Sequence, residues 1–520
     1  MSLFQAAVVL SLLLLFLVIG TDYIDGWSKR KSLGEIPVID DGSCLSPRLR
    51  WTRSNWNMAE AYEKAYQSVR LPQPYSLPPK AMLNTSFNYS IQNGANLWRS
   101  DYHTTDTVNG MHYHTAVTDK LPIDAIYKCS NRALYLRQFH ATVVNGLDRF
   151  LPSTFPIGQA NEWYEANTSN AMFDMMAKVA ASFIIGPEFA TDNDFIQQAL
   201  SYMFQINATT AAIYSYPRIV RPLAWQFAPA CRALRSAIIS LKRRLIPEIR
   251  ARVSQARSGE KDGKFSMLNV LIDTAIEQNV LRRDRGCKEE ERAVDQLAQH
   301  TMFFFFDAAA PIASVATIML YRIMTSPEYA QSLREETSEA LKASGGEWSF
   351  EILSSMPRLE SYTREVLRIH VPLVWGPSRQ VLKPLTINSL KLTLQPGDLI
   401  TVPALFTHTD QDLYPDAMEF DPNRFYDSAS GKCVPRVTTA TDTFLSFGHG
   451  TCACPGRTLA MRAVQILFAK MLLLYEVEFA DGRKDFPANV LTPGFNLQDP
   501  TVMMRVKRRV SSGPANTAML

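Results

Sequence analysis

The sequence predicts a mainly α-helical fold with a minor β region, and three observations support this prediction. Through most of residues 124–342, apolar residues recur at steps of three and four, the spacing of one face of a helix. Residues 230–255 show such a stripe, with basic side chains opposite it: Leu234, Ile238, Leu241, Leu245 and Ile249. Short alternating stretches at 385–387 and 390–394 are typical of strands, and a helical pattern returns at 456–474.

Length and charge restrict the class of protein. The chain has 520 residues, of which 46% are hydrophobic, and this is enough for a large buried core. Its 54 basic and 50 acidic residues leave a formal net charge of +4, so the composition argues against a nucleic-acid partner. Because few strong boundaries interrupt the pattern, we predict one large domain over residues 37–510 and a flexible tail at 511–520.

The first twenty residues predict a membrane anchor. Residues 3–19 carry no charge and are almost entirely apolar, a length at the short end of what crosses a bilayer as a helix. A cleaved secretory signal is the alternative, but no basic residue precedes the apolar run and no convincing cleavage site follows it. The first basic cluster, at 29–31, comes after the span and should stay cytosolic. We therefore expect a single-pass anchor at 1–20 in a thin membrane such as the endoplasmic reticulum, a linker at 21–36 and a cytosolic domain.

Cysteine chemistry should be sought in one loop. The seven cysteines are too sparse for a disulfide framework and lack the CxxC spacing of structural zinc, and the close pair is Cys452 and Cys454. The sequence FGHGTCACPGR at 447–457 leads from a glycine-rich loop into a helix. Backbone N–H groups and the helix dipole would stabilise a thiolate at Cys454. A buried cysteine beside a turn, or a redox pair with Cys452, is the alternative interpretation.

The residues around this cysteine suit contact with a flat cofactor. Glycines at 448, 450 and 456 allow close approach of the backbone and conformations closed to other residues. Phe447 can shield the sulfur from water. Pro455 suits the first turn of the following helix, where its missing N–H is harmless.

The pattern F-x-x-G-x-x-x-C-x-G, from Phe447 to Gly456, resembles the signature of the cytochrome P450 family. The resemblance implies a P450 fold and catalytic domain over 37–510, with a haem b contacted by Phe447, Gly450 and Gly456. It implies that Cys454 is the metal ligand, giving the iron its axial thiolate. It also implies electrons from NADPH through an NADPH-cytochrome reductase, and a small apolar substrate.

Other residues match the family in the same order along the chain. Glu365 and Arg368 match its E-x-x-R helix, and Arg424 matches the arginine of its P-x-R-F element. The resemblance implies that these three form a structural triad that helps to retain the haem, although an isolated i, i+3 pair is more often a surface ion pair. Arg379 stands where the family places a cation for a haem propionate. His114 is a further candidate for that propionate, or an ordinary loop histidine.

The helix expected to cross the distal face of the haem departs from the family. The family carries an acid–alcohol pair there, but residues 307–313 read DAAAPIA, so Ala310 replaces the acid and Pro311 the threonine. That threonine ordinarily helps to deliver protons, and such general-acid assistance contributes about 10²–10⁴-fold to a rate. Pro311 lacks an N–H and its ring clashes with the carbonyl of Asp307, so we expect a kink that frees this carbonyl for a water. Asp307 or a substrate hydroxyl would then relay protons; alternatively, the kink serves packing and ordered water is the relay.

Two functions follow from these residues. The leading one is a monooxygenase of the ascomycete fungal branch, which segments 221–223 and 230–252 resemble and whose members commonly oxidise terpenoid, meroterpenoid or alkaloid intermediates of secondary metabolism. The candidates for contact with its substrate are Phe305, Phe306, Ala309 and 371–375. Some of the phenylalanines are equally candidates for the core, because a phenylalanine run on a helix points in all directions. The second is a haem-thiolate enzyme of atypical chemistry (rearrangement, dehydration, coupling or ring formation), supported by Ala310 and Pro311. A non-enzymatic haem carrier would not need the anchor and the full catalytic scaffold.

Overall fold

The computed structural model describes most of the chain after residue 119. The described residues are 120–157, 162–214, 224, 226–260, 263–281, 287–374, 378–380, 385–387, 392–394, 399–450, 453–491 and 496–509. The predicted anchor, linker and tail lie outside these residues, and so does His114. For some residues inside helices and strands, Arg379 among them, the description covers the backbone alone.

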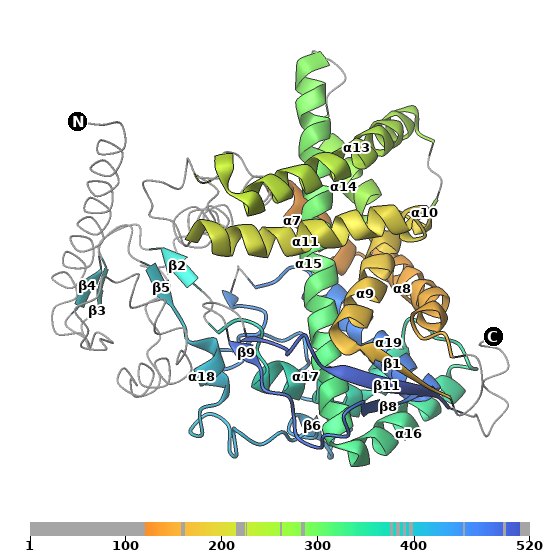
Figure 1. The fold of residues 1–520 in the computed structure, drawn as a ribbon, viewed down its shortest axis with the longest axis vertical. Helices are drawn as coiled ribbons and strands as arrows, with labels where there is room; N and C mark the ends of the chain where they lie inside the picture. The colour runs from red at the N-terminus through yellow and green to blue at the C-terminus, as the bar shows by residue number, and fades with distance from the viewer. Residues whose placement is uncertain are drawn as a thin grey trace, which may run out of the picture.

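Helices dominate the described part of the chain, as predicted. Their bounds are α7 (Lys120–Asn131), α8 (Ala133–Thr154), α9 (Thr168–Ile184), α10 (Pro187–Ala190), α11 (Asn193–Tyr214), α13 (Pro229–Ser258), α14 (Met267–Glu277), α15 (Cys287–Thr325), α16 (Pro327–Ala343), the 3₁₀ helix η3 (Ile352–Ser355), α17 (Pro357–Ile369), α18 (Ala404–His408) and α19 (Arg457–Leu474). Figure 1 shows α15 running through the middle of the molecule, with α11, α13 and α14 crossing near one end.

The strands are short and form a minor part of the fold. Their bounds are β1 (Trp163–Asn167), β2 (Ser378–Gln380), β3 (Leu385–Ile387), β4 (Leu392–Leu394), β5 (Leu399–Thr401), β6 (Tyr426–Asp427), β7 (Lys432–Cys433), β8 (Tyr475–Phe479), β9 (Val490–Leu491), β10 (Asn496–Leu497) and β11 (Met503–Arg508). A three-stranded antiparallel sheet has the order β1-β11-β8, and the other pairs are β2-β5, β3-β4, β6-β7 and β9-β10. The predicted strand at 385–387 is present as β3, and β4 covers residues 392–394 of the strand predicted at 390–394; the two strands pair with each other.

Strand β1 was not expected, because it lies inside the stretch with a helical pattern. It pairs with β11 from Trp163 opposite Lys507 to Asn167 opposite Met503. This partner lies more than 300 residues away in sequence, so local periodicity carries no signal for the pairing. The Asn167 side chain then accepts a hydrogen bond from the Asn170 N–H at 2.9 Å and caps the start of α9.

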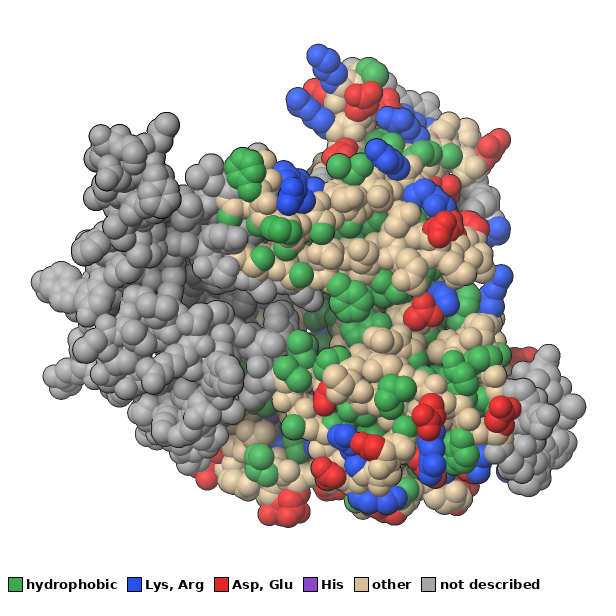
Figure 2. Space-filling model, in the orientation of Figure 1, with side chains coloured by type: hydrophobic (Ala, Val, Ile, Leu, Met, Phe, Trp, Pro, Cys, Tyr) green, Lys and Arg blue, Asp and Glu red, His purple; other side chains and the backbone are tan. Residues whose placement is uncertain are grey.

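Helix α15 forms the centre of the core. It packs against α9, α13 and α19, and most of its residues after Ala293 are buried. Among the described residues, it is the helix long and apolar enough to cross a membrane, but 67% of its apolar window is buried by the rest of the protein. It is therefore a core helix in this fold. Figure 2 shows charged side chains of both signs interspersed where the ends of α13 and α15 project.

Helix α13 follows the stripe predicted for residues 230–255. All five residues of that stripe are buried: Leu234, Ile238, Leu241, Leu245 and Ile249. Pro229 occupies the first turn, where its missing N–H has no cost, and Gly259 ends the helix with a left-handed φ of 82°. The apolar face and both ends of this helix are thus encoded locally.

Candidate active site

Backbone hydrogen bonds set the place of Cys454, just before α19. The Cys454 N–H donates to the carbonyl of Phe447 at 2.7 Å, and the Gly448 N–H donates to the carbonyl of Leu445 at 2.8 Å. Gly448 and Gly450 have φ angles of 71° and 68°, in the left-handed region that favours glycine. Glycine is therefore a backbone requirement at these two positions, where the chain folds back ahead of the cysteine.

Gly456 and Pro455 differ from the interpretation of the sequence. Gly456 is the N-cap of α19, with φ −86° and ψ 0°, a conformation open to other residues. A Cβ added to Gly456 would lie 3.8 Å from the Ile126 Cγ2 atom, an ordinary contact, so its described surroundings do not require glycine. Because α19 begins at Arg457, Pro455 precedes the N-cap instead of lying in the first turn. Helix ends read from a pattern are uncertain by a residue or two, which is the size of this error.

The Cys454 thiol is accessible and yet strongly desolvated. Burial raises the pKa of Cys454 to about 11, while the backbone N–H groups of Gly456 and Arg457 and the Arg457 charge favour the thiolate and lower this pKa. The negative charge of Asp307 raises it further. The side chain therefore keeps accessible surface although protein atoms surround most of it. A soft sulfur ligand that keeps accessible surface beside backbone N–H groups fits a haem iron.

A stripe of accessible residues follows one face of α15. Asp307 and Pro311 are exposed and Ala310 and Ser314 are half-buried, whereas the residues between them are largely buried. Positions at i, i+3, i+4 and i+7 share one face of a helix. The charge of Asp307 raises the pKa of Cys454, which indicates that this face of the helix lies on the side of the cysteine.

Asp307 is the acidic group of this stripe. Burial raises the pKa of the Asp307 carboxyl to about 7, so it is partly protonated at neutral pH. Tyr202, from α11, lies near it: burial and the charge of Asp307 together raise the pKa of the Tyr202 hydroxyl. The Asp307 side chain keeps accessible surface and is nevertheless surrounded by protein atoms.

The structure bears on two features expected of α15. The helix is continuous from Cys287 to Thr325 with Pro311 inside it, and the kink expected at Pro311 stays a prediction. Phe305 belongs to the core: it is 1% exposed, and its ring packs edge-on against Phe195 at a centroid distance of 5.5 Å. Phe306 is half-buried and packs against the same core.

Glu365, Arg368 and Arg424 meet in one buried ion cluster. Arg368 donates from Nε to Glu365 Oε2 and from a terminal nitrogen to Oε1, both at 2.7 Å, a bidentate pair. Arg424 Nε donates to Glu365 Oε1 at 3.1 Å. The Glu365 and Arg368 side chains are fully buried. Arg368 also donates to three backbone carbonyls: those of His408, Ala417 and Glu419.

The residues proposed for the propionates are described in part. Arg379 lies in β2, where its backbone pairs with Ile400 of β5, and its side chain is outside the description. His114 lies outside the described residues. Both assignments remain predictions.

Three residues of the region carried no clear signal in the sequence. Tyr202 lies near Asp307, Ser314 belongs to the distal stripe, and His408 bonds to both Arg368 and Leu445. Tyr202 belongs to a different helix from Asp307, so spacing along the chain does not link the two. Ser314 stands seven residues after Asp307, and this helical spacing is the signal that would have found it.

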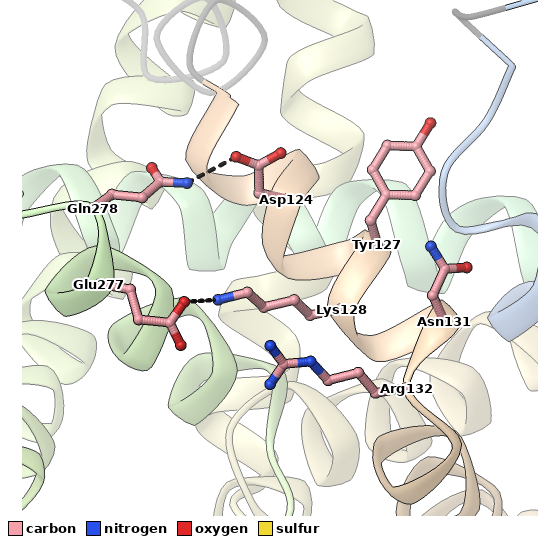
Figure 3. Close-up of a pocket in the computed structure, with 7 residues that line it drawn as sticks. All are labelled: Asp124, Tyr127, Lys128, Asn131, Arg132, Glu277 and Gln278. Atoms are coloured by element: carbon pink, nitrogen blue, oxygen red, sulfur yellow. Dashed lines mark hydrogen bonds and ion pairs between the residues drawn. The ribbon is translucent and has the colours of Figure 1, made fainter.

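A separate polar cleft lies at the surface between α7 and α14 (Figure 3). Its volume is about 360 Å³, and neither Cys454 nor Asp307 lines it. Lys128 pairs with Glu277 across it, and Gln278 donates to Asp124 at 2.8 Å. Its lining is open and charge-balanced.

Comparisons with known proteins agree on one family. The family model described as Cytochrome P450 matches residues 156–506. The cytochrome P450 monooxygenase cpsD of Aspergillus campestris is 34% identical, over 97% of this chain and 93% of that protein. The bicoumarin synthase desC of Aspergillus desertorum is 33% identical, over 95% of each chain. A solved structure of cyanobacterial CYP120A1 with bound retinoic acid has a TM-score of 0.58 at 18% identity, over 76% of this chain and 81% of that one, and so shows the shared fold.

Proposed function

This chain belongs to the cytochrome P450 family of haem-thiolate monooxygenases, and on that premise we propose that Cys454 is the thiolate ligand of its haem iron. One observation supports this role above the others. The Cys454 sulfur keeps accessible surface, and the backbone N–H groups of Gly456 and Arg457 at the start of α19 lower its pKa and so favour the thiolate. Phe447 and Gly450 would contact the haem from the same loop. When bound, the haem-thiolate supplies activation of dioxygen with two electrons.

On the distal side, Asp307 is our candidate for the group that delivers protons. It lies on the accessible stripe of α15, and its pKa of about 7 keeps a proton available near neutral pH. Ala310 and Pro311 occupy the positions of the acid–alcohol pair and supply no proton. The Asp307 carbonyl, which Pro311 cannot bond as a donor, offers an acceptor for an ordered water on that stripe.

The electron donor, membrane and substrate complete the proposal. We propose electrons from NADPH through a reductase, and an anchor at 1–20 that holds the enzyme at the endoplasmic reticulum with its catalytic domain in the cytosol. The substrate is a small apolar intermediate of fungal secondary metabolism, of the terpenoid, meroterpenoid or alkaloid class. Support comes from the fungal relatives and from the apolar surroundings of Asp307, which include the buried Ala309.

Oxidative coupling of phenols is the second candidate. Two matched relatives, from Aspergillus desertorum and Aspergillus niger, are named bicoumarin synthases. Coupling removes one hydrogen atom from each of two phenols and joins them by a new bond, while dioxygen, two further electrons and two protons are consumed and two waters form. Such a reaction inserts no oxygen into the substrate, and the names of these two relatives are what supports it for this chain.

Labelled dioxygen distinguishes these candidates. The full chain in microsomes, with a reductase and NADPH, would receive terpenoid, alkaloid and phenolic substrates under ¹⁸O₂. Monooxygenation gives a product that carries one labelled oxygen atom. A dimer that lacks two hydrogens and carries no label supports coupling instead. Turnover without NADPH or dioxygen would contradict both.

Replacing Cys454 tests the ligand assignment directly. Cys454→Ala removes the sulfur, so we expect loss of the thiolate-type carbon monoxide band and of turnover in haem-loaded protein. Buried Cys129 provides the matched control, because Cys129→Ala should leave that band in place. A Cys454→Ala protein that keeps the thiolate band would overturn the assignment.

A further inference from the structure

Helix α17 ends with carbonyl groups that bond to the chain leading into the cysteine loop. The last carbonyls of a helix have no partner within it. The Ser446 hydroxyl donates to the Leu367 carbonyl at 2.7 Å, and the His408 Nδ1 atom lies 2.9 Å from the Arg368 carbonyl. The helix that carries the ion cluster is therefore bonded at its end to both His408 and the cysteine loop.

The bonds of His408 fix its tautomer. The Arg368 carbonyl can only accept, so Nδ1 carries the hydrogen and donates it. The Leu445 N–H can only donate, and it lies 2.6 Å from Nε2, so Nε2 is the acceptor. Burial lowers the pKa of His408 to about 3, which agrees with a neutral ring. One rigid ring thus links a carbonyl of α17 to an N–H of the cysteine loop.

The surroundings of His408 leave its ring little freedom. Its side chain is fully buried and stacks on Phe444, with a centroid distance of 5.3 Å and an interplanar angle of 8°. The guanidinium of Arg364 lies 3.7 Å from the centroid of the Phe444 ring. Arg368 holds His408 a second time, through a bond of 2.6 Å from its guanidinium to the His408 carbonyl.

From Leu445 the connection continues to the sulfur ligand. The Leu445 carbonyl accepts from Gly448 at 2.8 Å, and the carbonyl of Phe447 accepts from Cys454 at 2.7 Å. We propose that His408 is a positioning residue, which transmits the rigidity of the Glu365–Arg368 ion cluster to the Cys454 loop and so holds the thiolate in place for the iron. This inference rests on the proposed role of Cys454.

Three substitutions separate the two bonds of His408. Glutamine reaches the position of Nε2, so His408→Gln can still accept from Leu445. Asparagine reaches the position of Nδ1, so His408→Asn can donate to Arg368 but leaves the Leu445 N–H buried without a partner. His408→Phe keeps an aromatic ring and loses both bonds. In haem-loaded full chain, carbon monoxide spectra give the ratio of non-thiolate to thiolate complex.

We expect the ratio of non-thiolate to thiolate complex to rise about fivefold or more in His408→Asn and His408→Phe, because each leaves a buried polar group without a hydrogen bond. In His408→Gln the ratio should change less than about twofold.

His140 supplies the matched control. It is also buried, and its hydrogen bonds join it to the Trp348 carbonyl at 2.8 Å and to Arg462 at 3.1 Å, both outside the cysteine loop. His140→Phe should lower the midpoint of thermal unfolding without changing the ratio.

Three results would overturn the inference, and the first two are an equal change of the ratio in His140→Phe and His408→Phe, and a His408→Gln protein as altered as His408→Phe. An unchanged ratio in His408→Asn and His408→Phe does so as well. All three leave the role of Cys454 intact, because the wild-type band and its loss in Cys454→Ala test that role separately. If the wild-type chain lacks the thiolate band, the proposed function fails and this inference fails with it.

Discussion

The two sides of the proposed haem site are built in different ways. On the cysteine side, the chain itself is fixed: Gly448 and Gly450 adopt left-handed conformations, and the Cys454 N–H bonds to the Phe447 carbonyl. On the distal side, a regular helix presents side chains, and Asp307 is the titratable group of its accessible stripe. The first side depends on backbone geometry and the second on the chemistry of single side chains.

This difference predicts how each side responds to substitution. Changes behind the cysteine loop should affect folding and haem binding together, because hydrogen bonds connect that loop to the ion cluster on α17. Changes on the distal stripe should leave the fold intact, because α15 is already held by its other faces. They should alter the reaction instead.

The largest effect is expected for Glu365→Gln. This change leaves Arg368 as a buried charge without its carboxylate, and breaking such a pair costs about 3–5 kcal/mol of unfolding free energy. Chemical denaturation and the haem content of the purified protein measure it. Glu360→Gln is the matched control on the same helix, because the Arg436 side chain that pairs with Glu360 is 66% exposed. A similar small loss in both variants would contradict the idea that the buried cluster stabilises the cysteine side.

The cysteine side was also the more predictable one. The cysteine loop and the Glu365–Arg368 pair are local patterns of a few residues at fixed spacing. The loop is recognised by its glycines and cysteine, and the pair by its two opposite charges. His408 joins segments some forty residues apart on either side, so its role depends on folded contacts that no spacing contains. The pairing of β1 with β11 and the proximity of Tyr202 to Asp307 also join segments distant in sequence, so neither could be predicted from spacing.

On the distal side, Asp307→Asn should give the larger of two effects. It removes the proposed proton donor, and we expect product formation per NADPH to fall about 100-fold while more peroxide is released. The raised pKa means that the carboxyl is protonated below about pH 7 and loses its proton above it. Wild-type product formation should therefore fall as the pH rises through about 7, and Asp307→Asn should lack this fall.

A second residue of the stripe provides the control for Asp307. Ser314→Ala removes a hydroxyl from the same face of α15, and we expect less than about a threefold change in product formation. If the fall with rising pH persists in Asp307→Asn, another group supplies the proton, and the distal role of Asp307 is wrong.

Pro311→Thr should give the smallest effect, and it sharpens the comparison because it restores the family's alcohol. If Asp307 already delivers protons, a hydroxyl at 311 adds little, and product per NADPH should change less than about threefold. In the Asp307→Asn background, the same substitution should raise product per NADPH about tenfold. The effects of the two changes are then non-additive, as expected for residues that serve one step. Pro311→Ala is the control, because it restores the backbone N–H of the helix without adding a hydroxyl. A gain seen in Pro311→Thr and absent from Pro311→Ala therefore comes from the hydroxyl. A gain of tenfold or more from Pro311→Thr alone would mean that the distal helix lacks an effective proton donor, and the distal role of Asp307 would then be wrong.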